Sequence, residues 1–232
     1  MNKSTPSTYQ KNLEFFEEKG TDREWHQIMM YNEVFIKSSK IPGDILEFGV
    51  ATGSSFKAFV RMNNIFNRER YHIVSQKRLY GFDSFEGLPE LNKKIDLAGF
   101  GGKEIGEIKK GGFNAKDFYK DIMKFTKVHK NCEIVKGWFD DTIPNFLDKN
   151  PHLTCSLIHV DCDIYESTKT VLKYFLSRLN VGGIILFDEI FQKNFPGETL
   201  AFIEQYNENN KICLKFKRVK SMPWKWYAIR KK

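Results

Sequence analysis

The sequence predicts an α/β fold in which a mostly parallel β-sheet has helices on both faces. Five runs rich in apolar and β-branched residues alternate with segments of helical periodicity, and they lie at 45–50, 78–85, 132–137, 155–161 and 182–189. Because these runs are nearly continuously apolar, we expect strands that are buried on both faces, as in parallel sheets. The closing segment 211–231 alternates polar and apolar residues around Pro223, which predicts an antiparallel hairpin at the sheet edge.

The predicted helices lie before and between these strands. Thr21 and Glu24 have the spacing of a capping box, so a helix is expected to begin there, and residues 1–40 are predicted to form an N-terminal helical cap. The glycine turn after the first strand leads into a second helix. Another helix, after the fourth strand, is followed by glycines and has inward-facing apolar residues at helical spacing, namely Leu172, Phe175, Leu176 and Leu179.

The length and composition predict one globular domain over residues 1–232. Hydrophobic residues make up 41% of the chain and aromatic residues 15%, which is enough for a two-sided core. The four cysteines show no CxxC spacing and are expected to be buried free thiols in a reducing compartment. The N-terminus lacks a secretory apolar region, and no apolar run approaches the length of a membrane span, so we expect a cytoplasmic protein without a membrane partner.

Two features leave the choice of binding partner open at this stage. The formal net charge is +8, which could serve nucleic-acid binding, but an excess of lysine is more often a solvated surface. We therefore favour a small-molecule partner over nucleic acid. Residues 91–112 contain several glycines and have no clear period, and we predict that they form a mobile loop over the site.

Acidic residues gather at the predicted strand ends. In open α/β sheets, ligands bind outside the carboxyl ends of the strands. Six acids occupy such positions, namely Glu47, Asp83, Asp161, Asp163, Asp188 and Glu189. Carboxylates this close repel one another unless a cation or a shared proton lies beside them. The pattern therefore indicates a functional site at this edge.

The turn after the first strand, LEFGVATGSS, indicates which kind of nucleotide the site could hold. Gly49 and Gly53 lie where backbone must pass close to a ligand. Ala51 occupies the second glycine position of a dinucleotide fingerprint and Ser54 follows Gly53, so that signal is poor, and no Walker A sequence is present. With a second acid at Asp83, the turn suits a ligand that has an amino acid part and a ribose.

Five motifs together carry a resemblance to a known family. They are ILEFGVATGSS, LYGFDSFEGLPE, VKGWFDDTIP, IHVDCDIYESTKTVLKYFLSRLNVGGIILFDE and FPGETLAFIEQY, in that order over about residues 40–206. The sequence resembles the macrocin O-methyltransferase family, class I S-adenosylmethionine-dependent enzymes that methylate sugar hydroxyls. The resemblance implies a seven-stranded Rossmann-like sheet, a hydroxylated small-molecule substrate such as a sugar, and a homo-oligomer, expected to be a dimer.

The resemblance assigns S-adenosylmethionine to the first strand ends. Asp83 would accept hydrogen bonds from the ribose hydroxyls, and Ser84 would assist. The first cofactor loop would consist of Glu47, Gly49, Gly53 and Ser54.

The same family pattern places the adenine beside Gly137, Trp138 and Phe139. Asp161, at the end of the fourth strand, would also border the cofactor. Composition alone favours a different interpretation of Trp138, as a core aromatic residue.

The resemblance also implies a divalent cation, usually Mg²⁺, that would offset the repulsion among the acids. Asp161, Asp188 and Glu189 match the family's ligand positions, and oxygen ligands suit Mg²⁺. The family usually has a second aspartate where this chain has Glu189. That residue could therefore ligate with shifted geometry, ligate through water, or not ligate.

Asp163 is our candidate for the general base that takes the proton of the acceptor hydroxyl. Strict strand alternation would put it on the same side as Asp161. Two alternatives remain open: Asp163 ligates the metal and Asp161 is the base, or Asp163 only caps the following helix. His159 is interpreted as a hydrogen-bonded core residue and His129 as a surface residue, so neither is a catalytic candidate.

Other functions remain in view. The cofactor could serve an RNA acceptor, although the sequence has no RNA-binding motif. A dinucleotide-dependent oxidoreductase could use a similar sheet, but the missing glycine pattern counts against this function. An inactive binding protein could retain the fold, since fold alone never proves activity.

Overall fold

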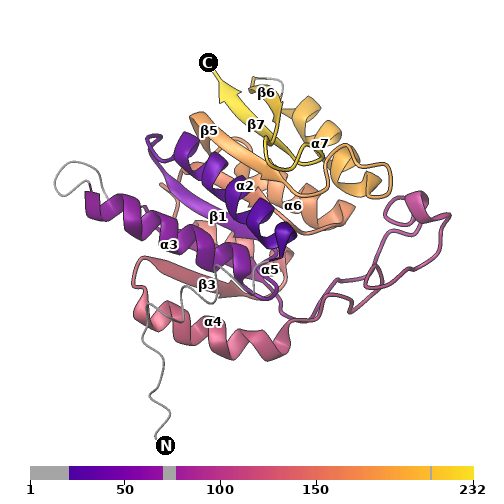
Figure 1. Ribbon diagram of the computed structural model, residues 1–232. Helices are drawn as coiled ribbons and strands as arrows, with labels where there is room; N and C mark the ends of the chain where they lie inside the picture. Colours follow the sequence, from indigo (N-terminus) through magenta and orange to yellow (C-terminus); the bar gives the residue numbers. More distant parts are fainter. Residues whose placement is uncertain (1–20, 70–76, 210) are drawn as a thin grey trace, which may run out of the picture.

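The computed structural model describes residues 21–69, 77–209 and 211–232. A seven-stranded sheet with the order β3-β2-β1-β4-β5-β7-β6 runs through the molecule (Figure 1). The strands are β1 (Asp44–Phe48), β2 (Leu79–Asp83), β3 (Cys132–Lys136), β4 (Cys155–Val160), β5 (Leu179–Phe187), β6 (Cys213–Arg218) and β7 (Trp226–Lys231). β1 to β5 pair in parallel, whereas β7 is antiparallel to both β5 and β6. The predicted fold class and the C-terminal hairpin are confirmed.

Helices cover both faces of the sheet. They are α2 (Asp22–Ser38), α3 (Ser54–Glu69), α4 (Lys116–Val128), α5 (Phe139–Lys149), α6 (Tyr165–Phe175) and α7 (Pro196–Glu208), with a short 3₁₀ helix, η2 (Ala98–Phe100). One apolar cluster joins the sheet to α2, α3 and α4, and the other joins it to α5, α6 and α7. Neighbouring strand residues divide between the faces: Ile45 joins the first cluster, and Leu46 the second. This division explains why the strands read as continuous apolar runs.

The N-terminal helix begins as its sequence predicts. The Glu24 amide donates to Thr21 Oγ1 at 3.3 Å, and the Thr21 amide donates to Glu24 Oε2 at 2.8 Å, which completes the capping box. The first twenty residues of the predicted N-terminal cap lie outside the described residues. None of the described helices is both long and apolar enough to cross a membrane.

Two details differ from the sequence predictions. The helix α6 ends at Phe175, and Leu179 already belongs to β5, where it pairs with Cys155. A register shift between β4 and β5 accommodates the residues before Ile184, which pairs with Leu157. All four cysteines are free, but Cys213 is exposed because it begins β6 at the edge of the sheet.

The segment 91–112 is mostly irregular, and Figure 1 shows it extending away from the sheet on the right. Its apolar side chains form a small cluster of their own with Leu88 and Ile164. The carboxylate of Asp96 is buried and accepts hydrogen bonds from the amides of Asn92 and Tyr165, both at 2.8 Å. The segment is thus tied to the beginning of α6, and its mobility stays a prediction.

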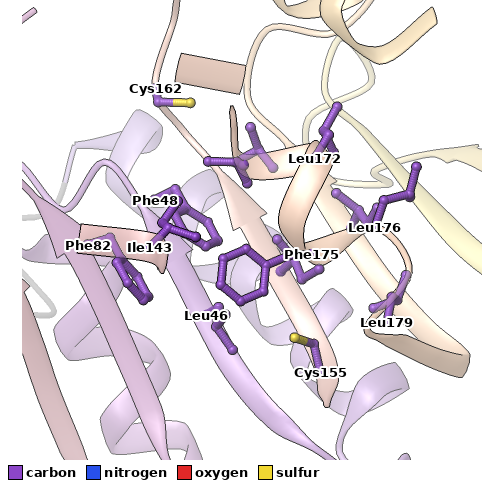
Figure 2. Close-up of a cluster of buried hydrophobic side chains, with 14 of the residues drawn as sticks. Leu46, Phe48, Phe82, Ile143, Cys155, Cys162, Leu172, Phe175, Leu176 and Leu179 are labelled. Atoms are coloured by element: carbon purple, nitrogen blue, oxygen red, sulfur yellow. The ribbon is translucent and has the colours of Figure 1, made fainter. Parts of the chain in front are cut away.

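The core between the sheet and α6 is aromatic. Figure 2 shows the rings of Phe48, Phe82 and Phe175 gathered where α6 crosses the strands. The ring centroids of Phe48 lie 4.8 Å from Phe82 and 5.1 Å from Phe175. All three side chains are fully buried, so this cluster fixes the position of α6 over β1 and β2.

Truncation of this cluster should destabilise the whole domain. We expect Phe175→Ala to lower the free energy of unfolding by about 3–5 kcal/mol, because it removes a buried ring and leaves a cavity. Urea denaturation followed by circular dichroism measures the loss. The matched control is Phe118→Ala on α4, since Phe118 is 46% exposed and its loss should cost far less. Equal losses in the two variants would contradict this account of the core.

Candidate functional site

A cavity of about 340 Å³ lies at the carboxyl edge of the sheet. The ends of β1, β2, β3 and β4 line it together with the first turns of α5 and α6. It gathers eight of the sequence-predicted site residues, namely Gly49, Asp83, Ser84, Gly137, Trp138, Phe139, Asp161 and Asp163. Glu47, Gly53, Ser54, Asp188 and Glu189 do not line it.

The register of the parallel strands determines which residues meet at this edge. Phe48 pairs with Val160, and Val160 pairs with Phe187. The residues that follow these three, including Asp161 and Asp188, therefore leave the sheet at the same level. Two distant sequence motifs are brought together in this way.

Gly49 permits a very close approach between two of these strand ends. Its φ is +92°, a conformation that favours glycine, and a Cβ atom there would lie 1.7 Å from the carbonyl oxygen of Asp161. Gly53 also has a positive φ, and a Cβ there would meet Ile122 at 2.8 Å. The glycines thus allow the first turn to pack against β4 and α4, and Gly49 itself borders the cavity.

Asp83 holds two strained turns at the mouth of the cavity. Its Oδ2 accepts a hydrogen bond from the Ala51 amide at 2.7 Å, and its Oδ1 accepts one from the Phe85 amide at 2.7 Å. Ala51 and Phe85 both have positive φ, at 45° and 62°. Each carboxylate oxygen can accept more than one hydrogen bond, so Asp83 can still accept from a ligand. The predicted contact to ribose stays a prediction.

Glu47 lies on β1, two residues before Gly49, and does not line the cavity. Its side chain is fully buried, and Oε1 accepts a hydrogen bond from the Ser55 hydroxyl at 2.6 Å. Glu47 can therefore support the first turn through Ser55 at the start of α3. Ser54, its predicted partner in the cofactor loop, is exposed at the helix start.

Trp138 is not a core residue. It is 38% exposed and lines the cavity, so the alternative interpretation from composition was wrong. Its neighbour Phe139 also lines the cavity and packs edge-on against Phe48, with centroids 5.7 Å apart. The pair offers a flat apolar wall that is supported from behind by the core.

The acids at the ends of β4 and β5 form a cluster beside the cavity. Ligand atoms of His159, Asp161 and Asp188 lie within 4.8 Å of one another, which is close enough to hold a metal ion. Burial raises the pKa of Asp161 well above its usual range, and the charge of Asp188 adds to the effect. For Asp163, burial and the charge of Asp188 raise the pKa to about 7. The acids predicted at the ends of β4 and β5 thus form one interacting group.

Lys225, which sequence reasoning missed, makes an ion pair within this group. Its ammonium lies 2.7 Å from Asp188 Oδ1 and 3.5 Å from Glu189 Oε1. Burial, the largest single effect, would raise the pKa of Asp188, but the charge of Lys225 together with hydrogen bonds from Lys225 and Glu189 lowers that pKa overall. Burial and the charge of Asp188 raise the pKa of Glu189 to about 8 despite Lys225. A lone lysine in the hairpin PWKWY carries no signal that would assign it to this site.

Asp163 does not cap α6. The cap position belongs to Ile164, and the Tyr165 amide donates to Asp96 from the segment 91–112. The structural alternative for Asp163 was therefore wrong. Asp163 has a φ of 61°, which is uncommon outside glycine, and it lines the cavity together with Asp161. Because β4 ends at Val160, this backbone conformation rather than strand alternation sets the direction of Asp163.

His159 is buried, as predicted. The expected hydrogen bond to its ring is absent from the described structure. Within the described part of the chain, both ring nitrogens lack a hydrogen-bond partner. The ring packs edge-on against Tyr31 and Phe59, and Nδ1 lies 3.9 Å from Glu47 Oε2. An unpartnered imidazole beside two carboxylates is a possible metal ligand. His129 is half-buried, where Asn64 lies at hydrogen-bond distance.

Loss of the Asp83 carboxylate should loosen both turns at the cavity. We expect Asp83→Ala to lower the free energy of unfolding by about 1–3 kcal/mol, because two backbone amides lose their acceptor. Urea denaturation measures the loss, and Asp148→Ala, at an exposed position on α5, is the matched control. If both variants were as stable as the parent, Asp83 would not be what holds Ala51 and Phe85 in place.

Comparison with known proteins adds relatives in sequence. The curated proteins include a tetracenomycin-C rhamnosyl 4'-O-methyltransferase of Streptomyces olivaceus, 29% identical over 154 residues, which are 64% of this chain and 53% of that protein. The demethyldecarbamoylnovobiocin O-methyltransferase of Streptomyces niveus is 25% identical over 155 residues, with 65% and 54% covered. The chain thus spans about half the length of the curated relatives it matches.

Solved structures show the same fold. The calicheamicin methyltransferase CalS11 superimposes with a TM-score of 0.77 at 24% identity, covering 98% of this chain and 87% of that one. The O-methyltransferase NovP gives a TM-score of 0.64 at 21% identity, covering 92% and 81%. The macrocin O-methyltransferase (TylF) family matches residues 24–227, which include the cavity and the acid cluster. The chain belongs to the macrocin O-methyltransferase family.

Proposed function

We propose that this protein transfers a methyl group from S-adenosylmethionine to a hydroxyl of a sugar, free or attached to another small molecule. The observation that carries the proposal is the position of the cavity, which joins the first glycine turn to Asp161 and Asp163. One side offers features of a nucleoside site, and the other offers carboxylates able to take a proton. Family membership supports the same reaction.

The cofactor would occupy the side formed by β1, β2 and β3. Asp83 would accept hydrogen bonds from the ribose, with Ser84 beside it, and Trp138 and Phe139 would stack against the adenine. Gly49 and Gly137 would keep the floor of the cavity free of side chains. The methyl group would then face the end of β4, where Asp161 lies.

The carboxylates near β4 and β5 suit a divalent cation such as Mg²⁺. Asp161 and Asp188 offer carboxylate oxygens, and the buried ring nitrogens of His159 have no partner in the described structure. When bound, such a cation would supply positive charge next to the acceptor oxygen. Glu189 lies outside this set and pairs with Lys225, so we assign it no ligand role.

Asp163 would act as the general base. As the acceptor oxygen attacks the methyl carbon, the new O–C bond forms and the S–C bond of the sulfonium breaks, which leaves neutral S-adenosylhomocysteine. The hydroxyl proton passes to the carboxylate of Asp163. A sugar hydroxyl is a weak nucleophile near neutral pH, so removal of its proton in the transition state is the contribution expected of this residue.

The acceptor would be a sugar because the relatives are named for such substrates. The Streptomyces olivaceus protein is named for a rhamnosyl group, and CalS11 for a rhamnose joined to a nucleotide. Glycosylated products and nucleotide-linked sugars are therefore the two acceptor classes to test. Nothing in the described residues 21–69, 77–209 and 211–232 favours RNA or a dinucleotide. The homo-oligomer and the cytoplasmic location stay predictions.

Binding of the cofactor product tests the first half of the proposal. We expect S-adenosylhomocysteine to bind the purified chain with micromolar affinity in isothermal titration calorimetry. Trp138→Ala should weaken binding by about tenfold, because stacking on an aromatic ring contributes about 1–3 kcal/mol per base. The control is Trp224→Ala, which removes an exposed tryptophan that does not line the cavity. Absence of binding to the parent chain would refute the methyltransferase proposal.

Removal of the base tests the second half. We expect Asp163→Asn to lower kcat by at least about 100-fold, the usual contribution of a general base, while the affinity for S-adenosylhomocysteine stays within about twofold. Methyl transfer to rhamnosides and nucleotide-linked rhamnose is followed by mass spectrometry. Asp148→Asn is the control, at an exposed position. Full activity of Asp163→Asn would remove Asp163 from the mechanism.

A further inference from the structure

The ammonium of Lys225 is surrounded by oxygen atoms of two acidic residues. Its ammonium donates to the carbonyl oxygen of Asp188 at 2.8 Å and pairs with the side chains of Asp188 and Glu189 at 2.7 and 3.5 Å. Only 11% of the lysine side chain is exposed. A buried ammonium with three oxygen acceptors on two residues is a specific arrangement, since lysine is rarely buried unless it is paired.

Hydrogen bonds and strand pairing hold the backbone around Lys225. The Lys225 amide donates to the Met222 carbonyl at 2.8 Å, and its own carbonyl accepts from the Val219 amide at 3.0 Å. The next residue, Trp226, pairs with Phe187 on β5. These contacts hold the root of the side chain next to the acid cluster, and four rotatable bonds separate that root from the ammonium.

The ammonium shares a ligand with the cation site. Asp188 belongs to the group of three residues able to hold a metal ion, and the same carboxylate is the nearest partner of Lys225. An ammonium and a divalent cation on one carboxylate repel each other strongly where little water separates them. Full coordination of an ion by Asp188 therefore conflicts with the present position of Lys225.

We propose that Lys225 is an internal counter-cation that competes with the divalent cation for Asp188 and withdraws when the ion binds. This inference rests on the cation site of the proposed function. With Lys225 inside, its ammonium offsets part of the negative charge of the acids without a metal. With Lys225 outside, the carboxylate of Asp188 becomes available to the ion. Lys225 is thus a residue that sets cation affinity, and it takes no part in the transfer itself.

Direct measurement of cation binding tests the competition without any need for activity. Mn²⁺ serves as the probe, and free Mn²⁺ is measured by electron paramagnetic resonance in titrations of the parent chain and of Lys225→Met. We expect the variant to bind Mn²⁺ at least about tenfold more tightly, because a repelling charge within a few ångströms is gone. The control is Lys217→Met on β6, an exposed position, which changes the net charge equally and should shift the affinity less than about twofold.

A second variant separates charge from packing. Lys225→Gln keeps a polar side chain of similar length, so it should also tighten Mn²⁺ binding, whereas a merely structural role for the lysine would leave the affinity unchanged or weaken it. Binding of S-adenosylhomocysteine serves as the check that each variant is folded, and its retention separates this inference from the cofactor proposal. Parent-like or weaker Mn²⁺ binding by both folded variants, or no Mn²⁺ binding by any protein, would overturn the competition.

Discussion

The parallel pairing of β1, β4 and β5 is the constraint on which the site depends. Their shared register ends the three strands at one level, and the chain leaves the sheet there with Gly49, Asp161 and Asp188 side by side. Gly49 allows the chain that leaves β1 to pass closer to the chain that leaves β4 than any side chain at this position would permit. The cost of this arrangement is electrostatic, because buried carboxylates accumulate where the strands end.

The polar groups around the acids limit this cost. Lys225 pairs with Asp188 and Glu189, and the Glu189 amide donates to Glu198 Oε1 at 3.0 Å. Burial nevertheless raises the pKa of Glu198 well above its usual range. The region thus combines ionised and protonation-prone carboxyl groups within one small volume. Such regions are typical of functional sites rather than of cores selected only for stability.

Sequence alone predicted the parts of the structure that depend on local pattern. Apolar runs located the strands, and their acidic ends located the site, because parallel strands all end at the same edge. The approximate position of Asp161 and Asp163 beside the cavity followed from this rule. The prediction was wrong where strand pairing overrides periodicity. Leu179 has helical spacing in the sequence, yet it belongs to β5 and pairs with Cys155 of β4.

Contacts between segments that are distant in the sequence could not be predicted from the sequence alone. Lys225 lies just before β7 and Asp188 just after β5; these two strands pair antiparallel, but no spacing in the chain connects the two residues. The helix cap of α6 is supplied by Asp96, sixty-nine residues earlier, so Asp163 was wrongly considered for it. His159 was expected to have a hydrogen-bond partner because most buried polar groups do. Such features depend on the three-dimensional arrangement and have no local signature.

The Tyr165 amide donates a hydrogen bond to the Asp96 carboxylate. This bond links the conformation of the segment 91–112 thermodynamically to that of the chain at Asp163. Tyr165 lies two residues after Asp163, so detaching Asp96 would remove the first hydrogen bond of the helix that follows Asp163. Loss of a helix cap costs about 1 kcal/mol. The position of the segment and the strained conformation of Asp163 therefore share part of one free energy, so whatever holds one in place also favours the other.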